Sequence, residues 1–208
     1  MTNLRVLHHR ALQVCVDLVD QVGTGQLGLA TPCAEWDLGQ LLAHMTGQNR
    51  GFAASARGES SDLGVFAPVP VSDAPGPLHA RSAADLTDAF AAADPAAQFW
   101  LPEIRAGGLF PAQTAFGFHL VDSVAHGWDV ARSIGVPVAF DAEVLDAALM
   151  ISLAIPDGPA RERPDASFRP GVGVNGDAGI FERILALLGR SPDWAPPQRS
   201  AAQASGAV

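Results

Sequence analysis

One long helical pattern constrains the fold of this chain more than any other feature of its 208 residues. Residues 111–134 begin with a proline, end before Gly135 and keep helical spacing, which predicts a single uninterrupted helix. The apolar side of this helix carries Leu120, Val121, Val124 and Trp128. At 100° per residue the polar residues share an arc of about 80°, and this polar stripe consists of His119, Asp122, His126, Asp129 and Ser133.

We expect the polar stripe to face the interior of a helical bundle, because the helix already has an apolar back and buried charges need partners or a metal ion. Asp122 and His126 are four residues apart, so their side chains can converge on one ion. His44 is the best candidate for a third ligand, because it lies among apolar residues in a second predicted helix, 37–57. Three such ligands leave one coordination position open for water or substrate, as in catalytic zinc sites.

The same residues admit plainer interpretations. His119 and Asp122 could pair with arginines, and His44 could be an ordinary buried histidine. His119 could also replace Asp122 as a ligand, although a spacing of seven from His126 reaches less well than a spacing of four. On residue pattern alone, metal binding and these alternatives are about equally supported.

Other polar residues receive lesser roles. Asp129 is expected to hydrogen bond to a metal-ligating side chain and orient it, or to anchor the helix end through Arg132. Trp36 and Trp128 are expected in the core or in a pocket wall. The three histidines without a partner at ligand spacing are expected on the surface, and they are His8, His9 and His79.

The rest of the chain predicts further helices, at 4–22, 82–94, 141–155 and 177–188. Pro95 ends the helix that starts at Ser82 or opens a short turn, and residues 58–81 are expected to form an ordered surface loop. Residues 168–174 carry a weak strand-like alternation. Residues 191–208 are rich in Ala, Pro and Ser, a composition typical of disordered segments. We therefore predict an all-α fold: a four-helix bundle over 1–190 with long loops and extra C-terminal helices, followed by a disordered tail.

Composition excludes several kinds of chemistry and partner. All 13 basic residues are arginine and tyrosine is absent, which excludes Schiff-base enzymes and the lysine of a P-loop. The net charge is −9 without a basic cluster, so we expect no nucleic-acid partner. We expect no membrane span and no secretory signal, and two cysteines, Cys15 and Cys33, do not make a disulfide framework. We expect a cytoplasmic protein that acts on a small molecule, with an exterior compatible with a homodimer.

Three stretches resemble the DinB-like, mycothiol-dependent maleylpyruvate isomerase family. Residues 31–37 read TPCAEWD and are followed by LLAH, which ends at His44. Residues 122–132 read DSVAHGWDVAR, and residues 181–194 read FERILALLGRSPDW, similar to the C-terminal part of single-domain members. The resemblance thus extends over about residues 1–194, and its first two motifs are specific in combination.

The resemblance implies a DinB-like four-helix bundle with a divalent metal held by His44, Asp122 and His126. Zinc is the expected ion, with nickel or iron as alternatives, and a low-molecular-weight thiol such as mycothiol is the expected cosubstrate. The isomerase carries glutamate where this chain has Asp122, whose side chain is one carbon shorter. We also expect this chain to lack the isomerase's second, C-terminal domain, which makes maleylpyruvate a poor substrate candidate.

Three functions follow as hypotheses. The first is a thiol-dependent S-transferase or isomerase, in which a metal-bound thiolate or water acts on a small anionic substrate held by Arg50 or Arg57. The second is another metal-dependent chemistry, either a lyase, cyclase or hydrolase, or non-haem iron chemistry, because two histidines and a carboxylate also describe such iron sites. The third is a non-catalytic module with a structural metal, which a triad sealed from solvent would support.

Overall fold

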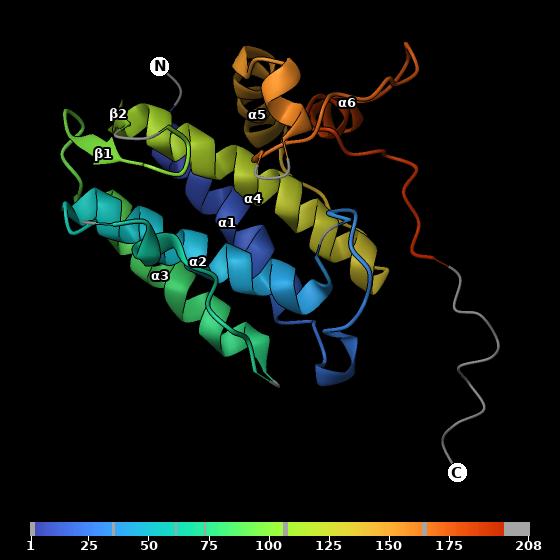
Figure 1. Ribbon diagram of the computed structural model, residues 1–208, viewed down its shortest axis with the longest axis horizontal. Helices are drawn as coiled ribbons and strands as arrows, with labels where there is room; N and C mark the ends of the chain where they lie inside the picture. The colour runs from blue at the N-terminus through green and yellow to red at the C-terminus, as the bar shows by residue number, and fades with distance from the viewer. Residues whose placement is uncertain are drawn as a thin grey trace.

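Four long helices form the body of the protein (Figure 1). The computed structural model describes residues 3–34, 36–60, 62–72, 74–105, 108–163 and 166–197. The four helices are α1 (Leu4–Val19), α2 (Leu38–Arg57), α3 (Pro75–Ala92) and α4 (Ala112–Ile134). α1 and α2 each contact both α3 and α4, so α1 lies diagonally opposite α2 in the bundle. The predicted all-α four-helix bundle is confirmed.

α2 begins and ends where local sequence signals predict. The side chain of Asp37 accepts a hydrogen bond from the backbone N–H of Gln40, and the side chain of Gln40 accepts one from the backbone N–H of Asp37. This capping box satisfies two backbone donors that have no partner within the helix. Gly58 ends the helix with a φ of 71°, a left-handed conformation that glycine adopts without strain.

α4 is covered on nearly all sides, which explains why so many of its residues are buried. Its apolar residues Leu120, Val121 and Val124 pack with buried side chains of α1 and of two C-terminal helices, α5 (Ala142–Ala154) and α6 (Ile180–Leu187). The helix also contacts α2, and it ends at Gly135 as predicted. The extra C-terminal helices of the prediction are therefore the elements that cover the back of α4 (Figure 1).

The structure corrects the predicted elements between residues 58 and 111. α3 begins at Pro75, seven residues before Ser82, because prolines are tolerated in the first helical turn, where the N–H groups have no helical partner. The predicted loop is shortened accordingly and contains the short 3-10 helix η2 (Leu63–Phe66). Instead of a helical turn near Trp100, an antiparallel hairpin forms between β1 (Gln98–Trp100) and β2 (Leu109–Pro111).

The ends of the chain differ from the prediction in detail. α1 stops three residues before Val22, and α6 starts three residues after Asp177. Residues 168–174 form no strand in the described part of the chain, and the remaining short helices are η1 (Thr24–Gln26) and η3 (Pro159–Glu162). Residues 198–208 of the predicted disordered tail lie outside the described residues, as does Glu35 of the first motif.

A helix that crosses a membrane must be long and apolar. Within the ranges that the structure describes, none is both long enough and apolar enough to span a bilayer.

Candidate metal centre

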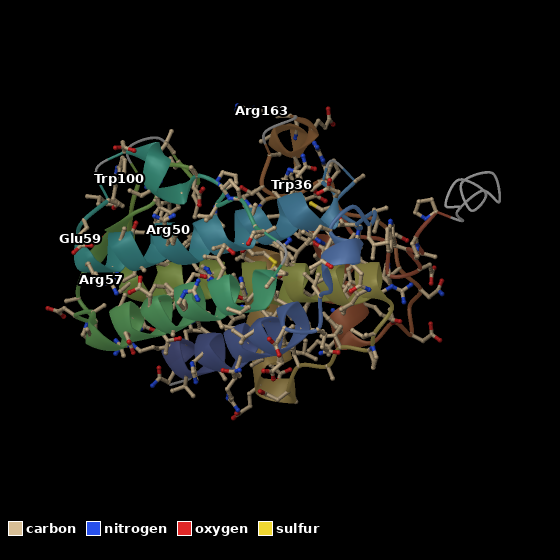
Figure 2. The ribbon with its side chains drawn as sticks, turned by 90° about the horizontal axis from the view of Figure 1, so that it is seen from below. Trp36, Arg50, Arg57, Glu59, Trp100 and Arg163 are labelled. Carbon is tan, nitrogen blue, oxygen red and sulfur yellow. The ribbon has the colours of Figure 1, made fainter. Side chains whose placement is uncertain are left out.

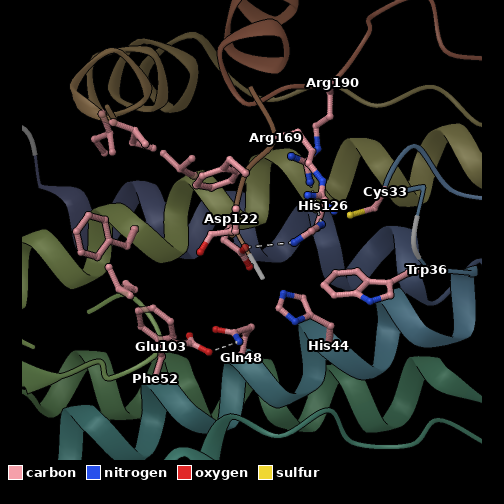
Figure 3. A pocket seen from close by; sticks show the side chains of 18 residues that line it. Cys33, Trp36, His44, Gln48, Phe52, Glu103, Asp122, His126, Arg169 and Arg190 are labelled. Atoms are coloured by element: carbon pink, nitrogen blue, oxygen red, sulfur yellow. Dashed lines mark hydrogen bonds and ion pairs between the residues drawn. The ribbon is translucent and has the colours of Figure 1, made fainter. Parts of the chain in front are cut away.

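α2 and α4 bring His44, Asp122 and His126 together between them (Figure 3). One ligand atom from each residue lies within 4.8 Å of the ligand atoms of the other two. His126 Nε2 is 3.3 Å from Asp122 Oδ1, and the imidazole rings of His44 and His126 lie edge to face with centroids 5.1 Å apart. The structure thus places the three predicted ligands in one cluster, and their binding of a metal stays a prediction.

A cavity of about 430 Å³ lies directly over this cluster. Trp36 forms part of its wall and packs against His44, with ring centroids 4.5 Å apart. Most of the remaining wall is apolar, with contributions from Phe52, Phe118, Val121, Ile151, Ile155 and Phe168. Glu103 and Ile104 line the cavity and are themselves exposed, so the cluster is reachable from solvent. An open cavity is the arrangement expected of a catalytic rather than a structural metal site.

Behind His126 lies a buried chain of two further side chains. His126 Nδ1 is 2.9 Å from Asp129 Oδ2, and Arg190 Nη2 is 2.8 Å from the same oxygen. The carboxylate therefore holds the proton of His126 on Nδ1 and directs Nε2 toward the cluster. Asp129 thus occupies the position of a supporting residue, whereas Arg132, its predicted alternative partner, hydrogen bonds to the carbonyl of Trp194.

The cluster also shifts the protonation of its members. Burial lowers the pKa of His44 to about 4, assisted by the nearby His126. For His126 burial acts in the same direction, but Asp122 and then Asp129 outweigh it and raise the pKa to about 9. Burial opposes ionisation of Asp122, yet His126 and His44 lower its pKa below the ordinary range. A neutral imidazole and an ionised carboxylate are the forms that bind metals, so His44 and Asp122 have the binding form at neutral pH, whereas His126 must release a proton to an incoming ion. These donors suit zinc, nickel or iron.

His119 lies elsewhere, although it belongs to the predicted polar stripe. Its Nδ1 is 2.9 Å from His8 Nε2 and 3.3 Å from the hydroxyl of Ser123, and it does not line the cavity. The plainer interpretation in which His119 and Asp122 pair with arginines is not seen, because their polar partners in the described chain are His8, Ser123 and His126. The expectation that His8 and His79 are surface residues is wrong, because both are buried between helices.

The two predicted anion-binding arginines also lie away from the cavity. Figure 2 shows Arg57 at the end of α2 that is far from Trp36, where its guanidinium pairs with Asp85 at 2.6 Å. Arg50 is exposed, and neither arginine lines the cavity. The arginines that do line it are Arg169 and Arg190.

Sequence reasoning missed several polar residues of the cavity wall, among them Gln48, Glu103, Arg169 and Arg190. Gln48 follows His44 by four residues and Phe52 follows Gln48 by four, so helical spacing alone would have placed all three on one face of α2. Glu103 and Arg190 come from a hairpin turn and from the segment after α6, and no local pattern connects them to the cluster. Cys33 also lines the cavity, and neither cysteine is part of a disulfide.

Comparison with known proteins identifies relatives of this chain. Residues 8–131, which include the whole cluster, match the family model described as mycothiol maleylpyruvate isomerase N-terminal domain. Two similar curated proteins are the uncharacterized proteins MT0763 and Rv0738 of Mycobacterium tuberculosis, strains CDC 1551 / Oshkosh and ATCC 25618 / H37Rv. Each is 28% identical over 190 residues, which cover 88% of this chain and 96% of the relative.

Two solved structures share the fold. The crystal structure of the mycothiol-dependent maleylpyruvate isomerase has a TM-score of 0.60 at 14% identity, over 93% of this chain and 94% of that chain. A histidine-to-alanine mutant of that isomerase has a TM-score of 0.58 at 13% identity, over 81% and 77% of the two chains.

Proposed function

Because the chain belongs to the family of the mycothiol maleylpyruvate isomerase N-terminal domain, we propose that it is a divalent-metal-dependent enzyme that uses a low-molecular-weight thiol. The reaction is a transfer or an isomerisation on a small anionic substrate, and mycothiol is the thiol that the family name suggests. One observation carries the proposal: His44, Asp122 and His126 lie together beneath an open cavity large enough for a small molecule.

His44, Asp122 and His126 would hold the ion, and zinc is our first choice because two imidazoles and one carboxylate are common zinc ligands. A bound divalent ion supplies Lewis acidity, which lowers the pKa of a coordinated thiol or water so that a nucleophile is present at neutral pH. Nickel and iron fit the same donor set, and elemental analysis distinguishes the three.

The side chains around the cluster have separate tasks in this proposal. Asp122 offsets part of the positive charge of an ion, and Asp129 keeps Nε2 of His126 directed at it. Trp36 packs against His44 and restricts the rotation of its ring. The apolar walls exclude water, which strengthens electrostatic interactions inside the cavity. Arg169 lines the cavity wall, where its guanidinium, with five N–H donors, could donate hydrogen bonds to an anionic substrate.

The non-catalytic alternative is less well supported, because a structural metal site fills its coordination sphere with protein ligands and is closed to solvent. Here only three ligands converge, and a cavity lies above them. A cytoplasmic location stays our prediction, since cysteines outside any disulfide and thiol chemistry suit a reducing compartment.

The proposal is tested first by metal content. Purified wild type is expected to bind one equivalent of added zinc after dialysis, and His44→Ala is expected to lose it. His9→Ala is the matched control, because His9 is an exposed histidine outside the cluster. Equal zinc content in wild type and His44→Ala contradicts the proposed site. Addition of a thiol to cobalt-substituted wild type is then expected to produce thiolate-to-cobalt absorption.

A further inference from the structure

The cavity over the cluster extends along α2 and α4 beyond the three predicted ligands. The ring of His44 lies against His126, whereas Phe52, eight residues further along α2, lies against His119, with ring centroids 4.8 Å apart. The two helices are therefore antiparallel here, and eight residues of helix rise by about 12 Å. Phe52 still lines the cavity, which thus reaches about two helical turns from the cluster (Figure 3).

This extension of the cavity has an apolar wall. The wall is built from four separate segments of the chain: α2, α4, the C-terminal half of α5 with the residue after it, and the stretch after η3. We call it the apolar section, and it consists of Phe52, Phe118, Val121, Ile151, Ile155 and Phe168. Four of these side chains are only partly buried by the chain itself, and they are Phe118, Ile151, Ile155 and Phe168. An apolar ligand that covers them removes their surface from water, which favours its binding.

Two polar side chains of the cavity wall are already engaged within the protein. Nε2 of Gln48 donates a hydrogen bond of 3.0 Å to Oε2 of Glu103. Arg190 donates to Asp129 from Nε and Nη2, and to the backbone carbonyl of Leu188 from Nη1. The cavity thus combines polar groups at the cluster with an apolar extension. Apolar walls with a few polar groups that fix orientation are the usual composition of a small-molecule site.

We propose that the apolar section binds an alkyl or aromatic group of the substrate, while the reacting part of the substrate lies at the cluster of His44, Asp122 and His126. The inference rests on the proposed function, because it assumes that the substrate reacts at this cluster. It adds the class of substrate: a small molecule with an anionic group and a hydrophobic group that extends about 5–12 Å from the reacting atom, one to two helical turns.

The test begins with metal-free protein and straight-chain alcohols of four, six and eight carbons, whose binding is followed by isothermal titration. We expect the affinity to rise about three- to fifteenfold with each two added carbons, because each buried methylene is removed from water. The heat-capacity change of binding is expected to be negative for the same reason. Equal affinity for the three alcohols overturns the inference.

Ile155→Thr places a hydroxyl in the apolar section, and the hydrogen bonds at this position are made by the backbone of Ile155. Leu153→Thr is the matched control, because Leu153 lies two residues earlier and its side chain is 54% exposed. We expect Ile155→Thr to bind the eight-carbon alcohol about three- to tenfold less tightly than wild type, and Leu153→Thr to match wild type within about twofold. Equal affinity in the two variants, both shown to be folded by circular dichroism, contradicts the inference. If Ile155→Thr does not fold, the chain-length series on wild type decides alone.

A second measurement separates the inference from the proposed function. Cobalt-substituted wild type receives 2-mercaptoethanol, whose thiolate-to-cobalt absorption reports a thiol at the cluster, and then the eight-carbon alcohol. The absorption is expected to persist, since the thiol and the hydrophobic group of the substrate occupy different places. Displacement of the thiol by the alcohol overturns the assignment of the apolar section to the substrate. Absence of any thiol absorption contradicts the proposed function, whereas length-dependent binding of alcohols to metal-free protein still supports the apolar section as a binding site.

Discussion

Arg190 and Asp129 form a buried ion pair across 61 residues of sequence, with Nη2 of the arginine 2.8 Å from Oδ2 of the aspartate. The same carboxylate oxygen lies 2.9 Å from Nδ1 of His126. The segment that follows α6 therefore completes the support of a residue in α4. Because this support reaches the candidate metal cluster, we expect the stability of the C-terminal part to influence the predicted metal affinity.

Asp129→Asn is expected to lower zinc affinity by about 10- to 100-fold, because the amide no longer holds the His126 proton on Nδ1 as strongly. Competition with a chromogenic chelator measures the affinity at a temperature where circular dichroism shows the variant folded. Asp146→Asn, on the exposed face of α5, is the control and should match wild type. Equal affinity in Asp129→Asn and wild type would show that Asp129 has no influence on the cluster.

Arg190→Met is expected to destabilise the protein by about 3–5 kcal/mol, because it leaves the Asp129 charge buried without its partner. Urea unfolding of the metal-free protein measures the change. Combined with Asp129→Asn, the loss should be smaller than the sum of the two single losses, as for residues in direct contact. Arg57→Met is the control: it breaks the more exposed pair with Asp85 and should cost below about 1 kcal/mol.

Metal-free protein is expected to lose thermal stability between pH 7 and pH 9. The pKa of folded His126 is raised to about 9 by Asp122 and Asp129, against burial, from an ordinary value of 6.5. The folded protein binds this proton more tightly than the unfolded chain does. The resulting stability is fully present below the pKa of the unfolded state and is lost as the pH rises through the pKa of the folded state. His44, with a folded pKa of about 4, is mostly neutral in both the folded and the unfolded state in this pH range, so it contributes little to the change in stability.

Thermal unfolding in a chelator at pH 7, 8 and 9 measures this loss, with His126→Gln as the comparison. The variant should show a smaller decline in Tm, since it lacks the titrating ring. Glu103, with a pKa of about 7, contributes a further decline only at the lower end of the range. Identical declines in the two proteins would exclude His126 as the cause.

Asp122→Asn and Asp122→Glu are expected to differ in zinc binding although both change the same ligand. The amide of Asp122→Asn lacks the negative charge, so we expect zinc affinity to fall by more than tenfold, which corresponds to more than about 1.4 kcal/mol. The glutamate keeps the charge and should retain measurable binding, because the side chain is 25% exposed and borders the cavity, which leaves room for one more carbon. Isothermal titration of zinc checks both, and weaker binding by Asp122→Glu than by Asp122→Asn would contradict a charge-dependent role.

Gly47→Ala is expected to destabilise the protein by about 1–3 kcal/mol through overpacking. A Cβ at this position would lie 2.5 Å from the backbone oxygen of Ala67, and the backbone cannot move as easily as a side chain. Gly25→Ala is the matched control, since a Cβ there meets nothing within 4 Å. Equal stability of the two variants in urea would show that the contact between α2 and the segment after η2 relaxes without cost.

Local patterns in the sequence were sufficient to predict much of the fold and to select the three residues of the cluster. Asp37 and Gly58 mark the ends of α2, and Gly135 marks the end of α4, because capping depends on residues adjacent in the chain. The spacing of Asp122 and His126 placed both on one face of α4. Helical geometry is local, so these features can be read without knowing what packs against the helix.

Where the prediction was wrong, the cause lies in packing between distant segments. His8 and His79 have no special spacing, and only the assembly of α1, α3 and α4 buries them. The hairpin of β1 and β2 depends on cross-strand pairing of Phe99 with Phe110, which a propensity pattern for single segments does not show.

The sequence by itself determined that this chain forms an all-α bundle in which two helices present His44, Asp122 and His126. Only the tertiary structure decided that Arg190 supports His126 through Asp129 and that Glu103 lies in the same cavity wall. The physical reason is the range of the interactions. Caps and helix faces depend on neighbours within a few residues, whereas ion pairs and cavities depend on where the packing of the whole chain brings remote segments together.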